Sequence, residues 1–267
     1  MELYITRHGQ TKANVERYMQ GQTPGELTQE GCEQAKKFGI YYKDIKFDEI
    51  YCSDLLRAKK TLDIILAENL HKEEYKNKII YTDKIREINC KSMEHKPCSE
   101  YAKLRSSPPE RYRFNSSGPQ DETDIDIFYR TSIFLDDLIH KNISGKYSSG
   151  IKKENVYQLN EEANKISSDV VITLWKEKKL SVDNNNKELK KILILCHGGA
   201  IAEIMNNILY RMKKNVTIRR IVSQNTGLFV IQVFLKNKCD EKEIINDNDL
   251  IFNFKLFNDI THLNNIV

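Results

Sequence analysis

An apolar run that ends on a histidine and two glycines limits the folds open to this chain. The segment Lys191–Cys196 (KILILC) lacks polar alternation, which is typical of a parallel strand buried on both faces. A helical pattern follows, with apolar residues at Ile204, Ile208 and Leu209. A buried strand that leads directly into a helix predicts an α/β protein with a mostly parallel central sheet.

The amino terminus contains the same arrangement. Residues 3–6 have the β-branched and aromatic character of a strand and run directly into Arg7-His8-Gly9. The glycine allows a sharp turn where the strand ends. Because ligands of open α/β sheets bind at the carboxyl ends of the strands, an arginine beside a possible histidine nucleophile predicts an anionic substrate.

Hydrophobic periodicity predicts the remaining elements. Helices are expected at residues 29–43, 55–66, 127–139 and 161–178, and strands at residues 47–52, 78–81, 217–222, 228–235 and 251–256, with a turn at 225–227. Thr28 is expected to cap the first helix, Ser53 or Asp54 the second, and Thr123 the third. The strand at residues 228–235 could pair at a sheet edge, which would permit a homodimer.

Two kinds of interruption break the periodic pattern. Residues 88–120 contain four prolines among serines and charges, which predicts an irregular excursion with at most one short helix near residues 99–104. The polar segments at residues 141–160 and 183–186 predict surface insertions. We therefore expect one domain over residues 1–267, in which residues 88–160 form a lid or insertion region.

Composition excludes several classes of protein. With 40% hydrophobic and 30% charged residues, the 267-residue chain can bury a substantial core and is neither disordered nor fibrous. Its 42 basic and 38 acidic residues are interleaved without a basic stripe, which argues against nucleic acid as a partner.

The same inspection predicts a cytoplasmic protein with no membrane partner. The sequence has no signal-peptide pattern and no apolar run long enough to cross a bilayer. The six cysteines lack paired spacing, so most are expected to be reduced, with Cys52 and Cys196 buried in strand-like runs.

Five side chains next to predicted strand ends form a candidate site: Arg7, His8, Arg57, Glu87 and His197. Each alone has an ordinary explanation, since Arg57 could be a surface helix arginine, Glu87 a solvated loop acid and His197 a buried core histidine. Together, two arginines and two histidines can surround a tetrahedral dianion, because guanidinium forks match phosphate oxygens and stay charged. The set predicts a phosphate group as the ligand.

The same residues predict a reaction. A neutral His8 can attack phosphorus through one ring nitrogen while the other donates to a backbone carbonyl that fixes the tautomer. Arg7, Arg57 and His197 would stabilise the oxygens of the transferred phosphoryl group. Glu87 could protonate the leaving alkoxide and later accept a proton from water. The scheme requires no metal and no cofactor.

An ordered set of motifs from about residue 2 to residue 234 resembles the histidine phosphatase superfamily. The set comprises Arg7-His8-Gly9, Leu27-Thr28, Ser53-Asp54-Leu55, Arg86-Glu87, Glu122-Thr123 and His197-Gly198-Gly199. More narrowly, the motifs resemble the phosphoglycerate mutase-like branch, and Gln20-Gly21-Gln22 resembles TIGAR-type sugar bisphosphatases and related broad phosphatases. The resemblance implies a three-layer α/β/α sandwich whose mostly parallel central sheet has an antiparallel edge strand.

The resemblance also implies roles for individual residues. His8 would be the phosphorylated nucleophile and Glu87 the proton donor. Arg7, Arg57 and His197 would form the phosphate pocket. Asn14, Gln20, Gly21 and Gly198 would contact the transferred phosphate or the substrate.

Three functions stay open at this point. We favour a phosphatase that hydrolyses small phosphorylated metabolites, such as phosphosugars or phosphoglycerates, through a phosphohistidine. The first alternative is a cofactor-dependent phosphoglycerate mutase. Those mutases carry Glu-Arg-His-Tyr-Gly at the proton donor and an adjacent arginine pair, whereas this chain has Glu87-Ile88-Asn89-Cys90-Lys91 and Arg111-Tyr112-Arg113. The second alternative is a non-catalytic phosphate-binding module, which would be expected to lack part of the catalytic set.

Overall fold

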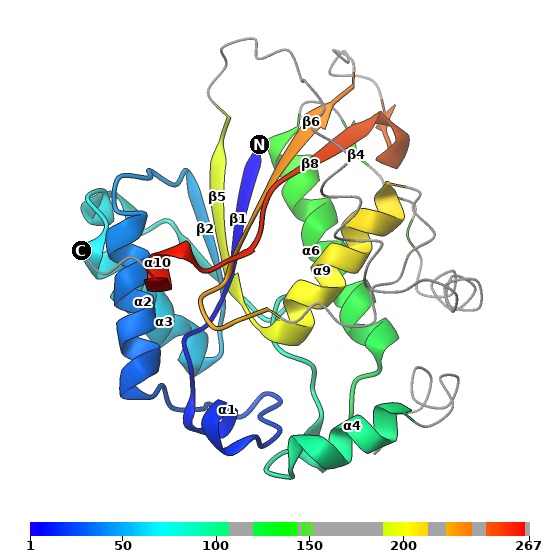
Figure 1. The fold of residues 1–267 in the computed structure, drawn as a ribbon. Helices are drawn as coiled ribbons and strands as arrows, with labels where there is room; N and C mark the ends of the chain where they lie inside the picture. The colour runs from blue at the N-terminus through cyan, green and yellow to red at the C-terminus, as the bar shows by residue number, and fades with distance from the viewer. Residues whose placement is uncertain are drawn as a thin grey trace.

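The computed structural model describes residues 1–106, 120–143, 146–147, 149, 151, 189–212, 223–236 and 244–264 (Figure 1). In chain order, the elements of the amino-terminal part are β1 (Glu2–Arg7), α1 (Lys12–Glu16), α2 (Gln29–Tyr41), β2 (Glu49–Ser53), α3 (Leu56–Glu68), the 3-10 helix η1 (Lys72–Tyr75), β3 (Ile79–Thr82), the 3-10 helix η2 (Lys91–Met93) and α4 (Cys98–Ser106). The remaining elements are α6 (Asp124–Asn142), β4 (Lys146–Tyr147), β5 (Lys191–Cys196), α9 (Gly198–Arg211), β6 (Leu228–Leu235), β7 (Ile244–Ile245), the 3-10 helix η4 (Asp247–Asp249), β8 (Leu250–Asp259) and α10 (Thr261–Asn264).

Within the described residues, six strands form the central sheet in the order β3-β2-β5-β1-β6-β8. The strands β3, β2, β5 and β1 are parallel neighbours, and β6 runs antiparallel to both β1 and β8. In the pairing of β1 with β5, Arg7 lies opposite Cys196. The residues that follow, His8 and His197, therefore leave the sheet side by side.

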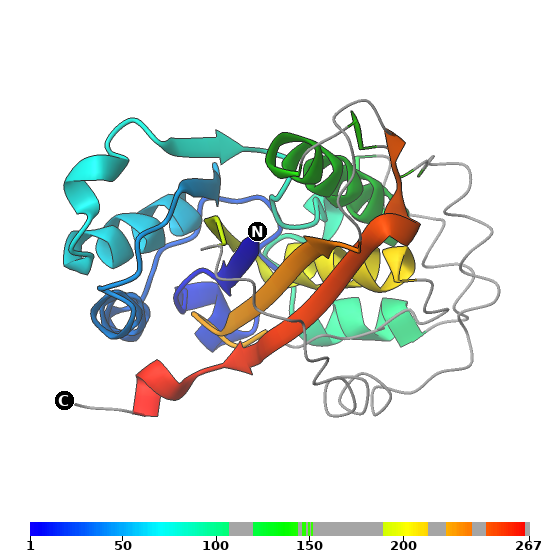
Figure 2. The same cartoon turned by 90° about the horizontal axis from the view of Figure 1, so that it is seen from above.

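The alternation of side chains along each strand produces three layers. Ile192 and Ile194 of β5 pack in a core cluster with α6 and α9, whereas Leu193 and Leu195 pack in a second cluster with α2 and α3. Figures 1 and 2 show these two helix pairs on opposite faces of the sheet. The predicted three-layer α/β/α fold is confirmed. The continuous apolar run Lys191–Cys196 is the central strand β5.

Two of the predicted helix caps are confirmed and one is wrong. The side chains of Thr28 and Thr123 accept hydrogen bonds from backbone amides at the starts of α2 and α6. Helix α3 has Leu55 as its N-cap and no side-chain cap. The expected caps have other partners: Ser53 Oγ lies 2.8 Å from His197 Nε2, and the Asp54 carboxylate accepts two hydrogen bonds from Arg86.

The sequence suggested that the strand at residues 228–235 could pair at a sheet edge, whereas β6 lies inside the sheet. It pairs with β1 on one side and with β8 on the other, from Leu235 opposite Leu250 to Leu228 opposite Asp259. Both rows of its backbone groups are therefore occupied within the chain. The expectation of a homodimer rested on a free edge at this strand, so β6 gives it no support. After β8 the chain forms the short helix α10.

The first part of the predicted excursion is fastened to the loop after α1. The Met19 amide donates to the Lys96 carbonyl at 2.8 Å, and the His95 amide donates back to the Met19 carbonyl at 2.9 Å. The Cys98 amide donates to the Arg17 carbonyl at 2.8 Å, at the start of α4, the short helix expected near residues 99–104. Figure 1 shows α1 and α4 beyond the carboxyl ends of the parallel strands.

Some predictions lie outside the described residues: the helix at residues 161–178, the strand at 217–222, the polar run at 183–186 and the arginines at 111 and 113. Cys52 and Cys196 are buried free thiols, as expected. Among the helices that the structure describes, none combines the length and apolar character needed to cross a bilayer.

Candidate active site

His8 is held in one tautomer at the carboxyl end of β1. Its Nδ1 lies 2.8 Å from the Gly9 carbonyl oxygen, which can only accept, so Nδ1 carries the proton. The Nε2 lone pair then accepts from Arg57 Nε at 3.3 Å. Burial, and after it the charges of Arg57 and Arg7, holds the pKa of His8 well below its ordinary value. The imidazole is therefore neutral, with its free nitrogen directed at Arg57.

Arg57 reaches His8 from the first turn of α3 and is 1% exposed. Its Nη1 donates to the Thr23 carbonyl at 2.6 Å and its Nη2 to the Gly21 carbonyl at 2.8 Å. Burial lowers the pKa of Arg57 to about 10, so the guanidinium stays charged at neutral pH. Gly21 has a φ of 51°, and a Cβ there would lie 2.4 Å from Glu94 Oε1, which explains the glycine.

Gln20 lies beside the same loop. Its Oε1 accepts from Thr11 Oγ1 at 3.2 Å, and its Nε2 would lie 2.2 Å from a Cβ at Gly25, a position 3.3 Å from Arg57 Cδ. The contacts of Gln20 and Gly21 are therefore with the loop that holds Arg57, and their direct contact with substrate stays a prediction.

Arg7 supplies a second guanidinium, on a residue that is half-buried. Its Nη1 donates to the Ser223 carbonyl at 2.7 Å, while Nε has no hydrogen-bond partner within the described chain. Burial lowers the pKa of Arg7, and the carboxylate of Glu87 opposes that shift. A Cβ at Gly198 would lie 3.7 Å from Arg7 Nε, so the first residue of α9 lies against this guanidinium.

His197 lies next to His8, with 5.1 Å between the ring centroids. Its Nε2 and the hydroxyl of Ser53 are 2.8 Å apart, and its Nδ1 is buried without a partner in the described residues. Burial, followed by the charge of Arg57, holds the pKa of His197 well below its ordinary value. The sequence suggested only a capping role for Ser53, and its contact with His197 appears once β2 and β5 are paired.

Glu87 is joined to the start of α9. The Gly199 amide donates to both carboxylate oxygens, at 3.1 Å to Oε1 and 3.2 Å to Oε2, and the Ile88 amide donates to Oε1 at 2.9 Å. A Cβ at Gly199 would lie 2.2 Å from Oε1, so only glycine permits this approach. Oε1 accepts from both amides, whereas Oε2 accepts only from the Gly199 amide that it shares with Oε1. Oε2 is therefore the oxygen better able to carry a proton.

The turn at residues 223–227 encloses the backbone of Arg7 and His8. Asn225 Nδ2 donates to the His8 carbonyl at 3.0 Å and to Asn14 Oδ1 at 3.2 Å. The Thr226 amide donates to the Arg7 carbonyl at 3.2 Å. Sequence reasoning identified the turn but not the Asn225 amide, because asparagine before Thr-Gly is ordinary turn chemistry.

The carboxyl-terminal segment holds this turn in place. Asn258 Oδ1 accepts from the Gln224 amide at 2.9 Å, and His262 Nε2 lies 2.9 Å from Thr226 Oγ1. His262 is buried and packs edge-on against Phe38 of α2. The residues at the end of the described chain therefore support the backbone on which His8 stands.

All nine residues expected at the site lie in one connected group. The structure brings together His8, Arg7, Arg57, His197, Glu87, Asn14, Gln20, Gly21 and Gly198 through the contacts given above. Two charged guanidiniums and two neutral imidazoles face a region in which Glu87 is the carboxylate that acts on both arginines. This arrangement can hold a dianion, offers an unprotonated ring nitrogen and places a carboxyl group nearby.

Comparison with known families agrees with this geometry. A model of the histidine phosphatase superfamily (branch 1) matches residues 3–147. The fructose-2,6-bisphosphatase TIGAR of Xenopus tropicalis is 38% identical over 99 residues, which cover 37% of this chain and 35% of that protein. A probable phosphoglycerate mutase GpmB of Shigella dysenteriae is 34% identical over 89 residues, covering 33% of this chain and 39% of that protein. The matched segments thus span little more than a third of these relatives.

Solved structures show the same fold. A mycobacterial glucosyl-3-phosphoglycerate phosphatase, in complex with VO3, superposes with a TM-score of 0.62 over 96% of this chain and 98% of that one. Its sequence identity of 15% carries the likeness no further than the fold.

The buried histidines predict a fold that is sensitive to acid. Because the folded-state pKa of His8 lies well below 6.5, the unfolded chain binds a proton below that pH that the folded chain does not, so stability is lost as the pH falls below about 6.5. Each such histidine contributes a slope of about 1.4 kcal/mol per pH unit. His8→Gln should reduce the slope of unfolding free energy against pH by that amount, as measured by urea titrations between about pH 6.5 and 5.

The matched control is His71→Gln, since the His71 side chain is 31% exposed. A pH slope that is the same in His8→Gln and in the wild type would mean that His8 is not a buried neutral imidazole.

Proposed function

This chain belongs to the histidine phosphatase superfamily (branch 1), and we propose that it hydrolyses small phosphorylated metabolites through a phosphohistidine at His8. Phosphosugars and phosphoglycerates are the substrate classes that we favour. The named activity of a matched relative, a fructose-2,6-bisphosphatase, supports this choice.

One observation carries the proposal: His8 presents an unprotonated Nε2 to a charged guanidinium while Nδ1 is tied to the Gly9 carbonyl. A structural histidine in a core has no need of two arginines around it. A nucleophile for phosphorus needs a free lone pair, and its phosphorylated product needs cations around the new negative charge.

The first step transfers the phosphoryl group to the enzyme. His8 Nε2 forms a bond to phosphorus as the bond from phosphorus to the ester oxygen breaks. Arg57, which donates to Nε2 in the free enzyme, is placed to transfer its hydrogen bond to a phosphoryl oxygen. Arg7 and His197 offer Nε and Nδ1, which are buried and have no hydrogen-bond partner in the described chain, to the remaining oxygens.

Glu87 handles the proton in both steps. Protonated at Oε2, it gives the proton to the leaving oxygen, so that an alcohol departs instead of an alkoxide. A water molecule then attacks the phosphohistidine and returns a proton to Glu87. Inorganic phosphate leaves, and His8 regains its free Nε2.

A phosphoglycerate mutase is the second candidate, because part of the chain matches a probable mutase at 34% identity. A mutase must keep water away from its phosphohistidine and hold a second acidic group of the substrate, whereas a phosphatase admits water. The Glu87-Ile88-Asn89-Cys90-Lys91 segment lacks the Arg-His-Tyr-Gly that follows the glutamate in those mutases. We therefore place hydrolysis first. A non-catalytic phosphate-binding module is least favoured, since the full catalytic set is present.

Brief incubation with a labelled phosphate monoester should label the protein, because the phosphoryl group is held on nitrogen during turnover. The label should survive an alkaline quench, be lost in acid, and map to His8. His8→Ala should remain folded and show neither label nor phosphate release. Release at the wild-type rate in His8→Ala would exclude the mechanism.

Glu87→Gln should discriminate between leaving groups. Glutamine can still accept from the Gly199 amide but has no proton to transfer, so kcat/KM for an alkyl phosphate, which covers only the steps up to departure of the alcohol, should fall by about 10²-fold or more. The kcat/KM for 4-nitrophenyl phosphate, whose phenolate leaves without a proton, should fall far less. Equal losses of kcat/KM on the two substrates would remove Glu87 from the role of proton donor.

A substrate panel separates hydrolysis from isomerisation. The panel compares 3-phosphoglycerate, 2,3-bisphosphoglycerate, fructose 2,6-bisphosphate and simple sugar phosphates, scoring released phosphate against rearranged product. We expect phosphate release to exceed isomerisation on every compound that reacts, because nothing in the 87–91 segment supplies the mutase pattern. Isomerisation of 3-phosphoglycerate as the faster reaction would reverse the assignment.

A further inference from the structure

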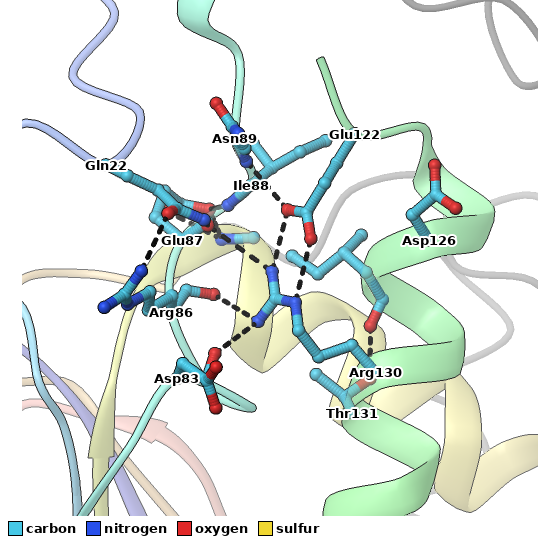
Figure 3. Close-up of polar contacts among 12 residues, drawn as sticks. Gln22, Asp83, Arg86, Glu87, Ile88, Asn89, Glu122, Asp126, Arg130 and Thr131 are labelled. Carbon is cyan, nitrogen blue, oxygen red and sulfur yellow. Dashed lines mark hydrogen bonds and ion pairs between the residues drawn. The ribbon is translucent and has the colours of Figure 1, made fainter. Parts of the chain in front are cut away.

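Arg130 of α6 lies behind the proposed proton donor and outside the phosphate pocket. Its side chain is 18% exposed and forms a two-pronged ion pair with Glu122, with Nε and Nη2 each 2.9 Å from a carboxylate oxygen. Figure 3 shows this guanidinium directed from α6 toward the segment that carries Glu87. Sequence reasoning noted Glu122-Thr123 as a motif but assigned no function to Arg130.

The guanidinium of Arg130 donates to backbone carbonyls in the segment that leads to Glu87. Nη1 lies 3.2, 3.0 and 3.0 Å from the carbonyl oxygens of Asp83, Lys84 and Arg86, and Nη2 lies 3.4 Å from that of Glu87. Residues 83–90 belong to no helix or strand, so these carbonyls have no regular ladder to join. Gln22 Nε2 also donates to the Glu87 carbonyl, at 3.1 Å, and the Arg86 amide to the Asp83 carbonyl, at 3.1 Å. The planar fork of Arg130 is the donor that all four carbonyls share, which a lysine ammonium could not be with the same geometry.

Glu122 holds the segment on the other side of Glu87. Its Oε2 accepts from the Asn89 amide at 2.8 Å, and its own amide donates to the Asn89 carbonyl at 2.7 Å. The paired side chains of Arg130 and Glu122 therefore bind the backbone both before and after the proton donor (Figure 3).

We propose that Arg130, paired with Glu122, is a positioning residue that sets where the Glu87 carboxylate stands. The inference rests on the proposed function, in which Glu87 transfers a proton. The Glu87 side chain is itself held by two amides, from Ile88 and Gly199, at 2.9 to 3.2 Å. A displacement of its backbone by about 1 Å would break the Gly199 contact, and a misplacement of that size costs about 10²-fold in rate.

The test uses Arg130→Met, in which the side chain keeps its length but loses the fork. The kcat/KM for an alkyl phosphate, which covers only the steps up to departure of the alcohol, should fall by about 10²-fold, while kcat/KM for 4-nitrophenyl phosphate should change by less than about 5-fold. Combined with Glu87→Gln, the substitution should add no further loss on the alkyl phosphate, because both act on one proton transfer. Arg130→Lys, which keeps the charge, should show the same selectivity for the leaving group.

The matched control is Lys141→Met on the same helix. Its ammonium forms an ion pair with Glu49 at the same 2.9 Å, remote from the 83–89 segment. It should leave both kcat/KM values unchanged. Equal losses on the two substrates in Arg130→Met, or additive losses in the double variant, would overturn the inference and leave Arg130 with a structural role only.

A second readout does not depend on catalysis. The nuclear magnetic resonance chemical shift of the Gly199 amide reports the hydrogen bond that this amide donates to the Glu87 carboxylate, and it should be the same in the wild type and in Lys141→Met. The shift should differ in Arg130→Met, in which the carboxylate is displaced. A Gly199 shift in Arg130→Met equal to that of the wild type would overturn the inference, whereas the absence of a phosphohistidine on His8 would count against the proposed function alone.

Discussion

The parallel pairing of β1 with β5 fixes the relation between the two site histidines. Arg7 lies opposite Cys196, and each strand ends with the next residue, so the His8 and His197 rings lie 5.1 Å apart. Both strands are covered by helices on their two faces, so the rings are excluded from water and the pKa of each lies well below its ordinary value. The pairing of β1 with β5 thus sets the distance between the two rings and places both where they are neutral.

The two arginines of the site donate to backbone carbonyls and form no ion pair among the described residues. Arg57 binds the carbonyls of Thr23 and Gly21, and Arg7 binds that of Ser223. Carbonyl oxygens satisfy N–H donors but leave the positive charge in place, so two cations stay available to an anion. Arg130 is the contrasting case, because it forms an ion pair with Glu122 in addition to its contacts with backbone carbonyls.

Local chemistry made much of the fold predictable. The apolar run at Lys191–Cys196 and the capping threonines before α2 and α6 are strong signals within a few residues, and each is confirmed. The helix α1 was missed because its five residues bury no side chain and so show no hydrophobic period. The edge position expected for β6 was wrong, because β8 pairs with it on that side. The residues between β6 and β8 give no sign of this pairing in the sequence.

The residues of the site were predictable by type and the contacts among them were not. An arginine or histidine at a strand end carries its own chemical signal. The Ser53 hydroxyl, the Asn225 amide and the Arg130 fork carry none, because each acquires its partner only when segments distant in sequence come together.

The turn that encloses His8 joins the first strand to the end of the described chain. Asn225 and His8 are separated by 217 residues. Asn258 and His262 form hydrogen bonds with the turn that contains Asn225. During synthesis the ribosome releases β1 first, long before β6, β8 and α10 exist to brace it. Contacts between such distant segments also form slowly once the chain is free. A nascent chain therefore carries the histidine without the pocket, and the proposed phosphate pocket is complete only after Asn225, Asn258 and His262 have been made.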